Sequence, residues 1–354
     1  MAEKSVAKAL ATGAVTVGAA GLLAGIGTAV AGRALWRSLT STSSLNGKVV
    51  LITGSSRGLG LALATECANQ GCRLAICARD QPTLQDAERE LRRLGAEVFA
   101  MPCDITERSA VETLVNEVVA RFGRIDVLIN NAGTIAVGPL ASLTPEDFEE
   151  AMDTMFWGML HTTLLVLPHM QARGEGHIAN VTSIGGRMAV PHLLAYSAAK
   201  FAATGFSEGL TAEVASQGIK VLTIIPGLMR TGSHHNAFFK GNNRAEYAWF
   251  GVSASAPLLA MGARRAAKRI VAAIRRGETE LTLGMPAKLA ALAHGIAPAT
   301  TVRALSVVNR LLPGAPEAGK RRHRGHQSES IATRSPLTAL GRKAAREWNQ
   351  QKLA

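Results

Sequence analysis

The stretch KVVLITGSSRGLG, residues 48–60, decides the fold. Residues 48–53 are apolar enough for a fully buried strand, and three glycines mark the turn into an expected helix over 58–70. Gly54 permits a tight turn, Gly58 lets a pyrophosphate approach the backbone, and Gly60 lets helix and strand pack closely. The free N–H groups at the start of such a helix bind phosphate. The stretch therefore predicts a dinucleotide-binding turn.

Strand and helix patterns alternate downstream of this turn. Apolar alternating segments of this kind form parallel sheets that are covered on both faces, and right-handed crossovers make the sheet doubly wound. We therefore predict one α/β domain with a doubly wound (Rossmann) parallel sheet. The further strands are expected at 73–78, 97–101, 125–130, 177–182, 219–225 and 279–283, and the helices at 81–94, 107–122, 145–173, 195–216 and 262–276.

Outside this domain the composition changes at both ends. We divide the chain into a hydrophobic leader and linker (1–46), a catalytic domain (47–285), a helical extension (286–313) and a basic tail (314–354). The extension either packs on the domain or forms a membrane-facing or substrate-covering element. The tail is polar and basic with few large apolar residues, so we expect it to be disordered.

The leader contains an uncharged segment, residues 9–32, which is long enough to cross a bilayer as a helix. We predict a membrane anchor. A cleaved signal peptide is an alternative, because residues 29–31 resemble a cleavage site, and so is a leader without a membrane role. Basic residues that follow the segment favour a membrane-associated protein whose catalytic domain faces the cytoplasm.

The net charge of +13 is concentrated at the two ends of the chain, while the domain between them is nearly balanced. A nucleic-acid partner is therefore not expected, because no basic stripe runs through the folded part. The four cysteines, which show no C-x-x-C spacing, predict reduced core thiols and no metal site. They are Cys67, Cys72, Cys77 and Cys103.

The end of the second strand bears on the choice of cofactor. It reads Cys77-Ala78-Arg79-Asp80, and Arg57 lies in the glycine turn. Two guanidinium groups near the adenosine ribose suit a 2′-phosphate, so we favour NADP(H) over NAD(H). Asp80 competes with this interpretation, because an acidic residue at the strand tip would accept the ribose hydroxyls if the strand ran one residue further.

A pair of residues four apart, Tyr196 and Lys200, predicts proton-transfer chemistry. This spacing places the phenol and the ammonium on one face of a helix. A nearby cation is expected to lower the tyrosine pKa, so that the phenol donates or accepts a proton near neutral pH. Ser183, just past a strand, would hold the substrate oxygen beside it.

Together these motifs resemble the short-chain dehydrogenase/reductase family over roughly residues 47–283. The resemblance implies a seven-stranded doubly wound sheet, a homodimer or homotetramer, and hydride transfer between NADP(H) and a carbonyl or alcohol carbon. The motifs are TGSSRGLG at 53–60, CDIT at 103–106, NNAG at 130–133, Ser183, YSAAK at 196–200 and PGLMRT at 226–231.

The resemblance also implies residue roles. Ser183, Tyr196 and Lys200 would be catalytic, and Asp104 would bind the adenine amino group. Lys200 would also hold the nicotinamide ribose, and the segment from Pro226 to Thr231 the carboxamide. The full cofactor set comprises Gly54, Ser56, Arg57, Gly58, Leu59, Gly60, Arg79, Asp104, Asn131, Ala132, Gly133, Tyr196, Lys200, Pro226, Gly227 and Thr231.

One position departs from the family pattern D-x-N-x-x-G. Met155 stands where the family has an asparagine that holds a water connecting the catalytic lysine to solvent. The relay would instead run through Thr154, His161 or a repositioned water. The alternative function is a catalytically impaired, membrane-associated NADP(H)-binding sensor or scaffold.

The segment 232–260 resembles the family's substrate-covering loop. It is rich in aromatic residues, which favours an apolar, lipid-like ketone or alcohol as substrate. We interpret His234 and His235 as polar loop residues. The aromatic residues are Phe238, Phe239, Tyr247, Trp249 and Phe250.

Overall fold

The computed structural model describes residues 43–314 and 320–351. The segment 9–32, and with it the anchor prediction, lies outside the described residues. Within the described ranges, no helix combines the length and the hydropathy that a bilayer crossing requires. The account below concerns the compact unit that begins at Leu45.

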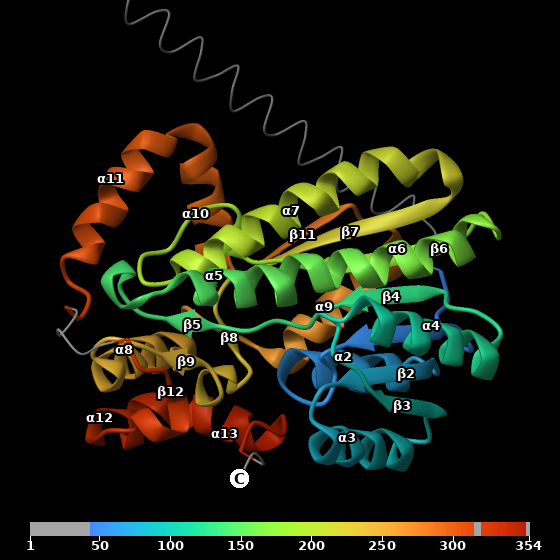
Figure 1. Cartoon of the computed structure of the whole chain (residues 1–354), viewed down its shortest axis with the longest axis horizontal. Coiled ribbons are helices and arrows are strands. Elements are labelled where there is room, and N and C mark those ends of the chain that lie inside the picture. The colour runs from blue at the N-terminus through green and yellow to red at the C-terminus, as the bar shows by residue number, and fades with distance from the viewer. Residues whose placement is uncertain (1–42, 315–319, 352–354) are drawn as a thin grey trace, which may run out of the picture. The chain divides into compact units, whose positions relative to one another are not determined.

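The core of this unit is a seven-stranded sheet in which every neighbouring pair is parallel (Figure 1). The strand order is β3-β2-β1-β4-β6-β7-β11, which confirms the predicted doubly wound fold. All five residues of β1 are buried, as its apolar sequence predicts. The strands are β1 (Val49–Thr53), β2 (Arg73–Ala78), β3 (Val98–Pro102), β4 (Val127–Asn130), β6 (Gly176–Val181), β7 (Ile219–Pro226) and β11 (Glu280–Leu283).

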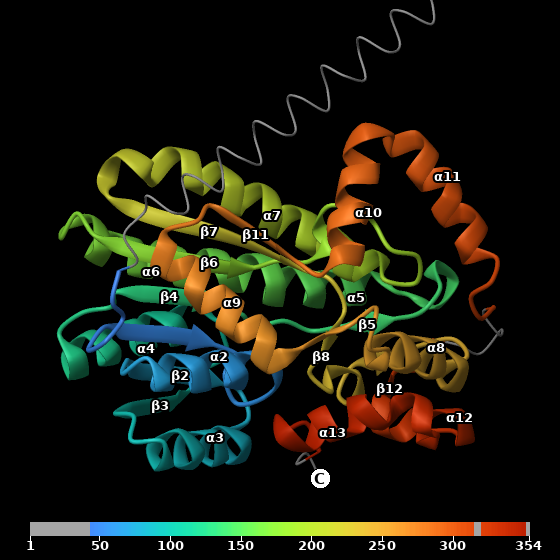
Figure 2. The same ribbon diagram turned by 180° about the vertical axis from the view of Figure 1, so that it is seen from behind.

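Helices cover both faces of the sheet. One face packs against α2 (Gly58–Asn69), α3 (Gln81–Arg93) and α9 (Ala263–Arg276), which lie in front of the sheet in Figure 2. The other face packs against α4 (Arg108–Phe122), α6 (Gly158–Gln171) and α7 (Leu194–Val214). The four cysteines are free and buried.

The long helix expected over 145–173 is interrupted. It consists of α5 (Pro145–Met152), a π-helical turn over Asp153–Trp157, and α6. Single π-helical turns of this kind are frequent at functional sites. The turn contains Met155, the residue that departs from the family pattern.

Small elements lie beside the carboxyl edge of the sheet. β5 (Ala136–Val137) pairs with β9 (Phe238–Phe239), and β8 (Met229–Arg230) pairs with β10 (Met261–Gly262). Helix α8 (Asn243–Ser255) follows β9. β9 and α8 lie in the segment 232–260, which the sequence analysis compares with the family's substrate-covering loop.

The extension forms two helices, α10 (Met285–Ile296) and α11 (Pro298–Asn309). Figures 1 and 2 show the pair standing out from the sheet and its helices. α11 contains no buried residue, and in α10 only Ala287 is buried. The extension is therefore helical, but it does not pack on the domain along its length.

The structure differs from the prediction of a disordered tail over residues 320–351. This segment forms β12 (His323–Arg324), α12 (Ile331–Arg334) and α13 (Ala339–Glu347), which lie beside α8 (Figure 1). β12 pairs antiparallel with β9. Few large apolar residues are present, but Trp348 is only 3% exposed and packs into the main core. Its burial, together with ion pairs to the domain, orders the segment.

Candidate active site

A cavity of about 660 Å³ opens at the carboxyl edge of the sheet, beside the point where the strand order reverses between β1 and β4. Every residue that the sequence assigns to catalysis or to cofactor binding lines this cavity. The same wall includes Thr134, Ile135, Glu150, Thr154, Met155, Val181, Ser233, Asn236, Ala237, Phe238, Arg324 and Gln350.

The glycine turn between β1 and α2 is held too tightly for side chains. Gly54 has a φ of 62°, and a Cβ there would lie 2.7 Å from the Cα of Ala132. A Cβ on Gly60 would lie 2.1 Å from the carbonyl oxygen of Gly54. The amide of Asn131 donates to the carbonyl oxygens of Thr53 and Gly54 at 3.0 Å each. Asn131 thus braces the turn against β4.

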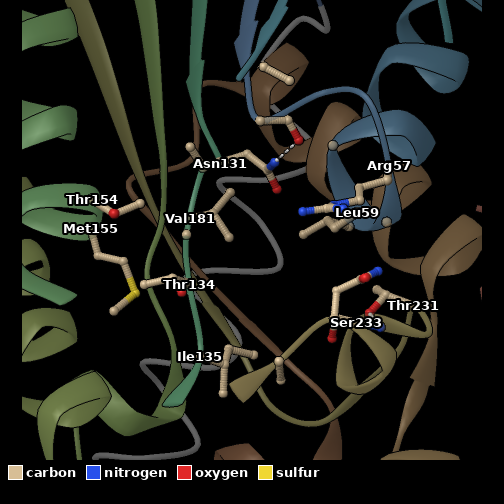
Figure 3. Close-up of a pocket in the computed structure, with 18 of the residues that line it drawn as sticks. Arg57, Leu59, Asn131, Thr134, Ile135, Thr154, Met155, Val181, Thr231 and Ser233 are labelled. Atoms are coloured by element: carbon tan, nitrogen blue, oxygen red, sulfur yellow. Dashed lines mark hydrogen bonds between the residues drawn. The ribbon is translucent and has the colours of Figure 1, made fainter. Parts of the chain in front are cut away.

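Arg57 projects from this turn into the cavity, on the opposite side from Thr154 and Met155 (Figure 3). Its Nη1 is buried and has no hydrogen-bond partner among the described residues. Burial lowers the pKa of Arg57, and the nearby charges of Arg324 and Arg79 lower it further, whereas Asp80 raises it. A buried, unpartnered guanidinium fits an anionic group such as a cofactor phosphate.

Asp80 lines the cavity, but its carboxylate already has a partner at the start of α3. β2 ends at Ala78, and the Asp80 carboxylate caps α3 by accepting from the backbone N–H of Thr83 at 3.0 Å. Hydrogen bonding from Thr83 lowers the pKa of Asp80. Arg79 stays at the cavity mouth, with Nη1 3.8 Å from a carboxylate oxygen of Asp104.

Ser183, Tyr196 and Lys200 meet at the other end of the cavity. Ser183 follows β6, and its Oγ accepts from the backbone N–H of Gly185 at 3.0 Å. Tyr196 and Lys200 share one face of α7, with the Lys200 Nζ 5.9 Å from the centre of the phenol ring. Lys200 is buried and donates to the carbonyl oxygen of Val181 at 2.8 Å.

The pKa of Tyr196 differs from the sequence-based expectation. Burial raises it, and a hydrogen bond with Ser183 offsets part of that rise. The Lys200 ammonium, which we expected to lower this pKa, donates to the carbonyl oxygen of Val181. Burial also lowers the pKa of Lys200 to about 8. The dry site therefore keeps the phenol protonated at neutral pH.

Met155 is 1% exposed and packs among Ala151, Ala195 and Ala199. Its neighbour Thr154 faces the cavity, and the Thr154 hydroxyl is buried without a partner among the described residues (Figure 3). His161 does not line the cavity, and its Nδ1 lies 3.3 Å from the carbonyl oxygen of Ile105. Of the two side chains that we considered for the proton relay, only Thr154 therefore lies at the cavity.

The aromatic residues after β7 are mostly core residues. Only Phe238 lines the cavity, while the other four do not. Phe239, Tyr247 and Phe250 are buried against one another, and Trp249 stacks edge-on with Phe250. His234 is buried as well, which lowers its pKa to about 4. His234 lies in the connection between β8 and β9, as predicted, but it is buried there and not solvated.

Sequence reasoning missed several cavity residues, and two of them, Arg324 and Gln350, come from outside the predicted catalytic domain. Both come from the tail, far along the chain from every motif, and no local pattern marks them. Within the described residues, no group of His, Cys, Asp and Glu side chains is arranged to hold a metal ion.

Comparisons with known proteins agree with this site. The short chain dehydrogenase family model matches residues 48–240, and the chain belongs to this family. The putative oxidoreductase SadH of Mycobacterium tuberculosis is 37% identical over 249 residues, which cover 70% of this chain and 89% of SadH.

Two solved structures with bound NADPH are similar over most of the domain. A variant of actinorhodin polyketide ketoreductase with NADPH is 30% identical, with a TM-score of 0.59, covering 67% of this chain and 96% of the ketoreductase. L-sorbose reductase from Gluconobacter frateurii, complexed with NADPH and L-sorbose, is 26% identical, with a TM-score of 0.62, covering 69% and 97%.

Proposed function

We propose that this oxidoreductase uses NADP(H) to interconvert a carbonyl and an alcohol on an apolar, lipid-like substrate. The observation that carries the proposal is the shared cavity: the glycine turn and Arg57 lie at one end, and Ser183, Tyr196 and Lys200 at the other. A bound nicotinamide supplies the hydride. The residues of this chain position the reacting groups and move the proton.

In the direction of reduction, the Ser183 hydroxyl holds the substrate oxygen, and Tyr196 gives its phenol proton to that oxygen as the carbonyl carbon accepts the hydride. The product is the alcohol, and the tyrosine is left as a phenolate. The Lys200 ammonium stabilises this phenolate. In oxidation the same tyrosine accepts the proton. The raised pKa of Tyr196 keeps the phenol protonated before the step, as reduction requires.

The preference for NADP(H) over NAD(H) is supported by charge. Arg57 and Arg79 supply two guanidinium groups at the adenosine end, and the acid that would favour NAD(H), Asp80, is engaged in capping α3. The NADPH complexes of the two similar enzymes agree with this preference. A 2′-phosphate would give the buried Nη1 of Arg57 an anionic partner.

The apolar substrate class is supported by Ile135 and Met155, which line the cavity and pack in the apolar clusters that include Tyr196, and by Phe238, which also lines the cavity. The fold alone does not decide it, because the similar sorbose reductase is complexed with a sugar. We would therefore mix the purified protein with NADPH or NADH and a panel of apolar ketones, aldehydes and sugars, and follow the loss of nicotinamide absorbance.

Turnover of apolar ketones, faster with NADPH than with NADH, is the expected result. Turnover of polar sugars alone would overturn the substrate class, and a preference for NADH would overturn the cofactor assignment. Tight NADPH binding with no carbonyl reduced would point instead to the sensor or scaffold.

We further propose that the protein associates with membranes, with its catalytic domain on the cytoplasmic side, and forms homodimers or homotetramers. The uncharged segment 9–32 supports the first idea. So does the helical extension, where no acidic residue occurs between 285 and 314 and large apolar side chains are exposed. These are Met285, Leu289, Leu292, Ile296, Val302, Val307, Val308 and Leu311.

Flotation with vesicles that contain phosphatidylserine tests the membrane proposal. The full chain should float, and the double change Leu292→Glu and Ile296→Glu should weaken binding. Leu337→Glu is the matched control, because Leu337 is also exposed but lies outside the extension. A full chain that stays at the bottom of the gradient would contradict membrane association, and light scattering would give the oligomeric state.

A further inference from the structure

The C-terminal segment 320–351 reaches the glycine turn. The backbone N–H of Gly58 donates to the carbonyl oxygen of Trp348 at 2.9 Å, and the Asn349 amide donates to the carbonyl oxygen of Ser56 at 3.4 Å. A Cβ on Gly58 would lie 2.7 Å from the amide nitrogen of Gln350. The turn that would hold the cofactor pyrophosphate is thus in direct contact with the end of the chain.

This contact is firmly anchored. Trp348 is buried in the main core, and the guanidinium of Arg264 lies 5.5 Å from its ring centre. Arg264 also pairs with Glu347 at 2.8 Å. On the other side, the Asn236 amide donates to the carbonyl oxygen of Gln350 at 2.8 Å and to its side-chain oxygen at 2.6 Å. The segment therefore joins the glycine turn to the loop that follows β8.

The first residues of the segment lie beside the cavity. Arg322 donates to Asp147 at 2.9 and 2.6 Å and also pairs with Glu150, which fixes it to α5. Two residues on, the guanidinium of Arg324 lies 4.9 Å from the ring centre of Phe238 and lines the cavity. Within residues 43–314 and 320–351, no carboxylate pairs with Arg324.

Arg324 and Arg57 therefore bring two guanidinium groups to one cavity, and each lacks a carboxylate partner among the described residues. They are close enough for Arg324 to lower the pKa of Arg57. Asp80, Asp104 and Glu150 also line the cavity, but none of these carboxylates pairs with Arg57 or Arg324. Both guanidinium groups are therefore open to an anionic ligand. The dinucleotide carries such anions in its pyrophosphate and its 2′-phosphate.

We propose that residues 320–351 form a C-terminal clasp that retains the cofactor, in which Arg324 pairs with a phosphate of the dinucleotide and Gln350 covers the glycine turn. This inference rests on the proposed function. It adds a binding residue from outside the segment that the family model matches, which ends at residue 240.

The test compares Arg324→Ala with Arg321→Ala in the full chain. Arg321 is an exposed neighbour, so its replacement makes the same change in net charge without touching the cavity. Quenching or enhancement of NADPH fluorescence gives the dissociation constant, and stopped-flow displacement gives the release rate. Loss of one charge-assisted hydrogen bond predicts a dissociation constant about 10–100-fold higher for Arg324→Ala. Arg321→Ala should match the wild type.

Four further measurements complete the test. Arg324→Lys, which keeps the charge, should restore part of the affinity, and thermal unfolding verifies that both Arg324 variants are folded. Gln350→Ala should release NADPH faster than the wild type. Titration with NADH identifies the phosphate that Arg324 binds. If Arg324→Ala loses affinity equally for NADH and NADPH, the partner is the pyrophosphate. If it loses affinity for NADPH alone, the partner is the 2′-phosphate.

Equal NADPH affinity in folded Arg324→Ala and Arg321→Ala would overturn the clasp and leave the proposed function intact. Tighter binding in Arg324→Ala would overturn it too, because the segment would then obstruct the cofactor. A wild-type protein that binds neither NADPH nor NADH would overturn both the clasp and the proposed function.

Discussion

Replacing Asp147 with asparagine should destabilise the protein strongly, because this carboxylate is the centre of a buried charge cluster. It accepts from the backbone N–H of Thr144 at 2.8 Å, from Arg322, and from the ammonium of Lys240, which is itself buried. Asparagine keeps the shape but leaves Lys240 without a counter-charge. Breaking a buried pair in this way costs about 3–5 kcal/mol of unfolding free energy.

Urea unfolding of the wild type, Asp147→Asn and Glu150→Gln at pH 7 measures this cost. Glu150 is the matched control, because it also pairs with Arg322 but its side chain is 31% exposed. Exposed pairs contribute roughly 0–1 kcal/mol, so Glu150→Gln should change the unfolding free energy by no more than that. The m-values should agree, since all three proteins bury the same surface.

The cost should also depend on pH in a defined direction. Burial alone would raise the pKa of Asp147, but hydrogen bonds from Lys240, Thr144 and Arg322 hold it below its usual 3.8. A lowered folded-state pKa gives stability that is fully present above the unfolded-state value and is lost as the pH falls through the folded-state value. The difference in unfolding free energy between the wild type and Asp147→Asn should therefore become smaller below about pH 3.8. If Asp147→Asn lost no more unfolding free energy at pH 7 than Glu150→Gln does, the reasoning would be refuted.

Three other outcomes follow from the cavity. The kcat/KM for NADPH should fall as the pH rises through about 8, where Lys200 loses its charge, and a flat profile to higher pH would contradict this. Met155→Asn should lower the unfolding free energy by about 1–3 kcal/mol, because it buries an amide in an apolar cluster, whereas Met155→Leu should cost under about 1.5 kcal/mol. Gly60→Ala should abolish NADPH binding, because its Cβ would meet a backbone oxygen at 2.1 Å. Gly209→Ala, in open space on α7, should bind normally and be more stable by about 0.5–1 kcal/mol.

The parts of the structure that the sequence predicts are those with local causes. All seven strands lie where apolar runs predict them, because a strand buried on both faces needs such a run. The residues assigned to the cavity line it, because the carboxyl ends of parallel strands meet at one edge of the sheet. The positive φ of Gly54 is likewise a property of its own turn.

The parts that escape prediction depend on distant contacts. Residues 320–351 are ordered by the burial of Trp348 and by the ion pairs of Arg322 with α5. Neither contact can be predicted from the composition of the tail. Composition also could not show that Phe239 and Phe250 point into the core rather than the cavity. The pKa of Tyr196 rises because burial outweighs the hydrogen bond with Ser183, and the spacing to Lys200 does not reveal that burial.

The most direct test of the account is NADPH oxidation by Tyr196→Phe, with the best ketone from the substrate panel. The change removes one hydroxyl and keeps the ring that packs against Met155 and Ala199. Loss of the proton donor predicts a turnover at least about 10²–10⁴-fold slower, with an NADPH dissociation constant within about twofold of the wild type. Turnover that stays within tenfold of the wild type would show that another group supplies the proton and would contradict the assignment of Tyr196.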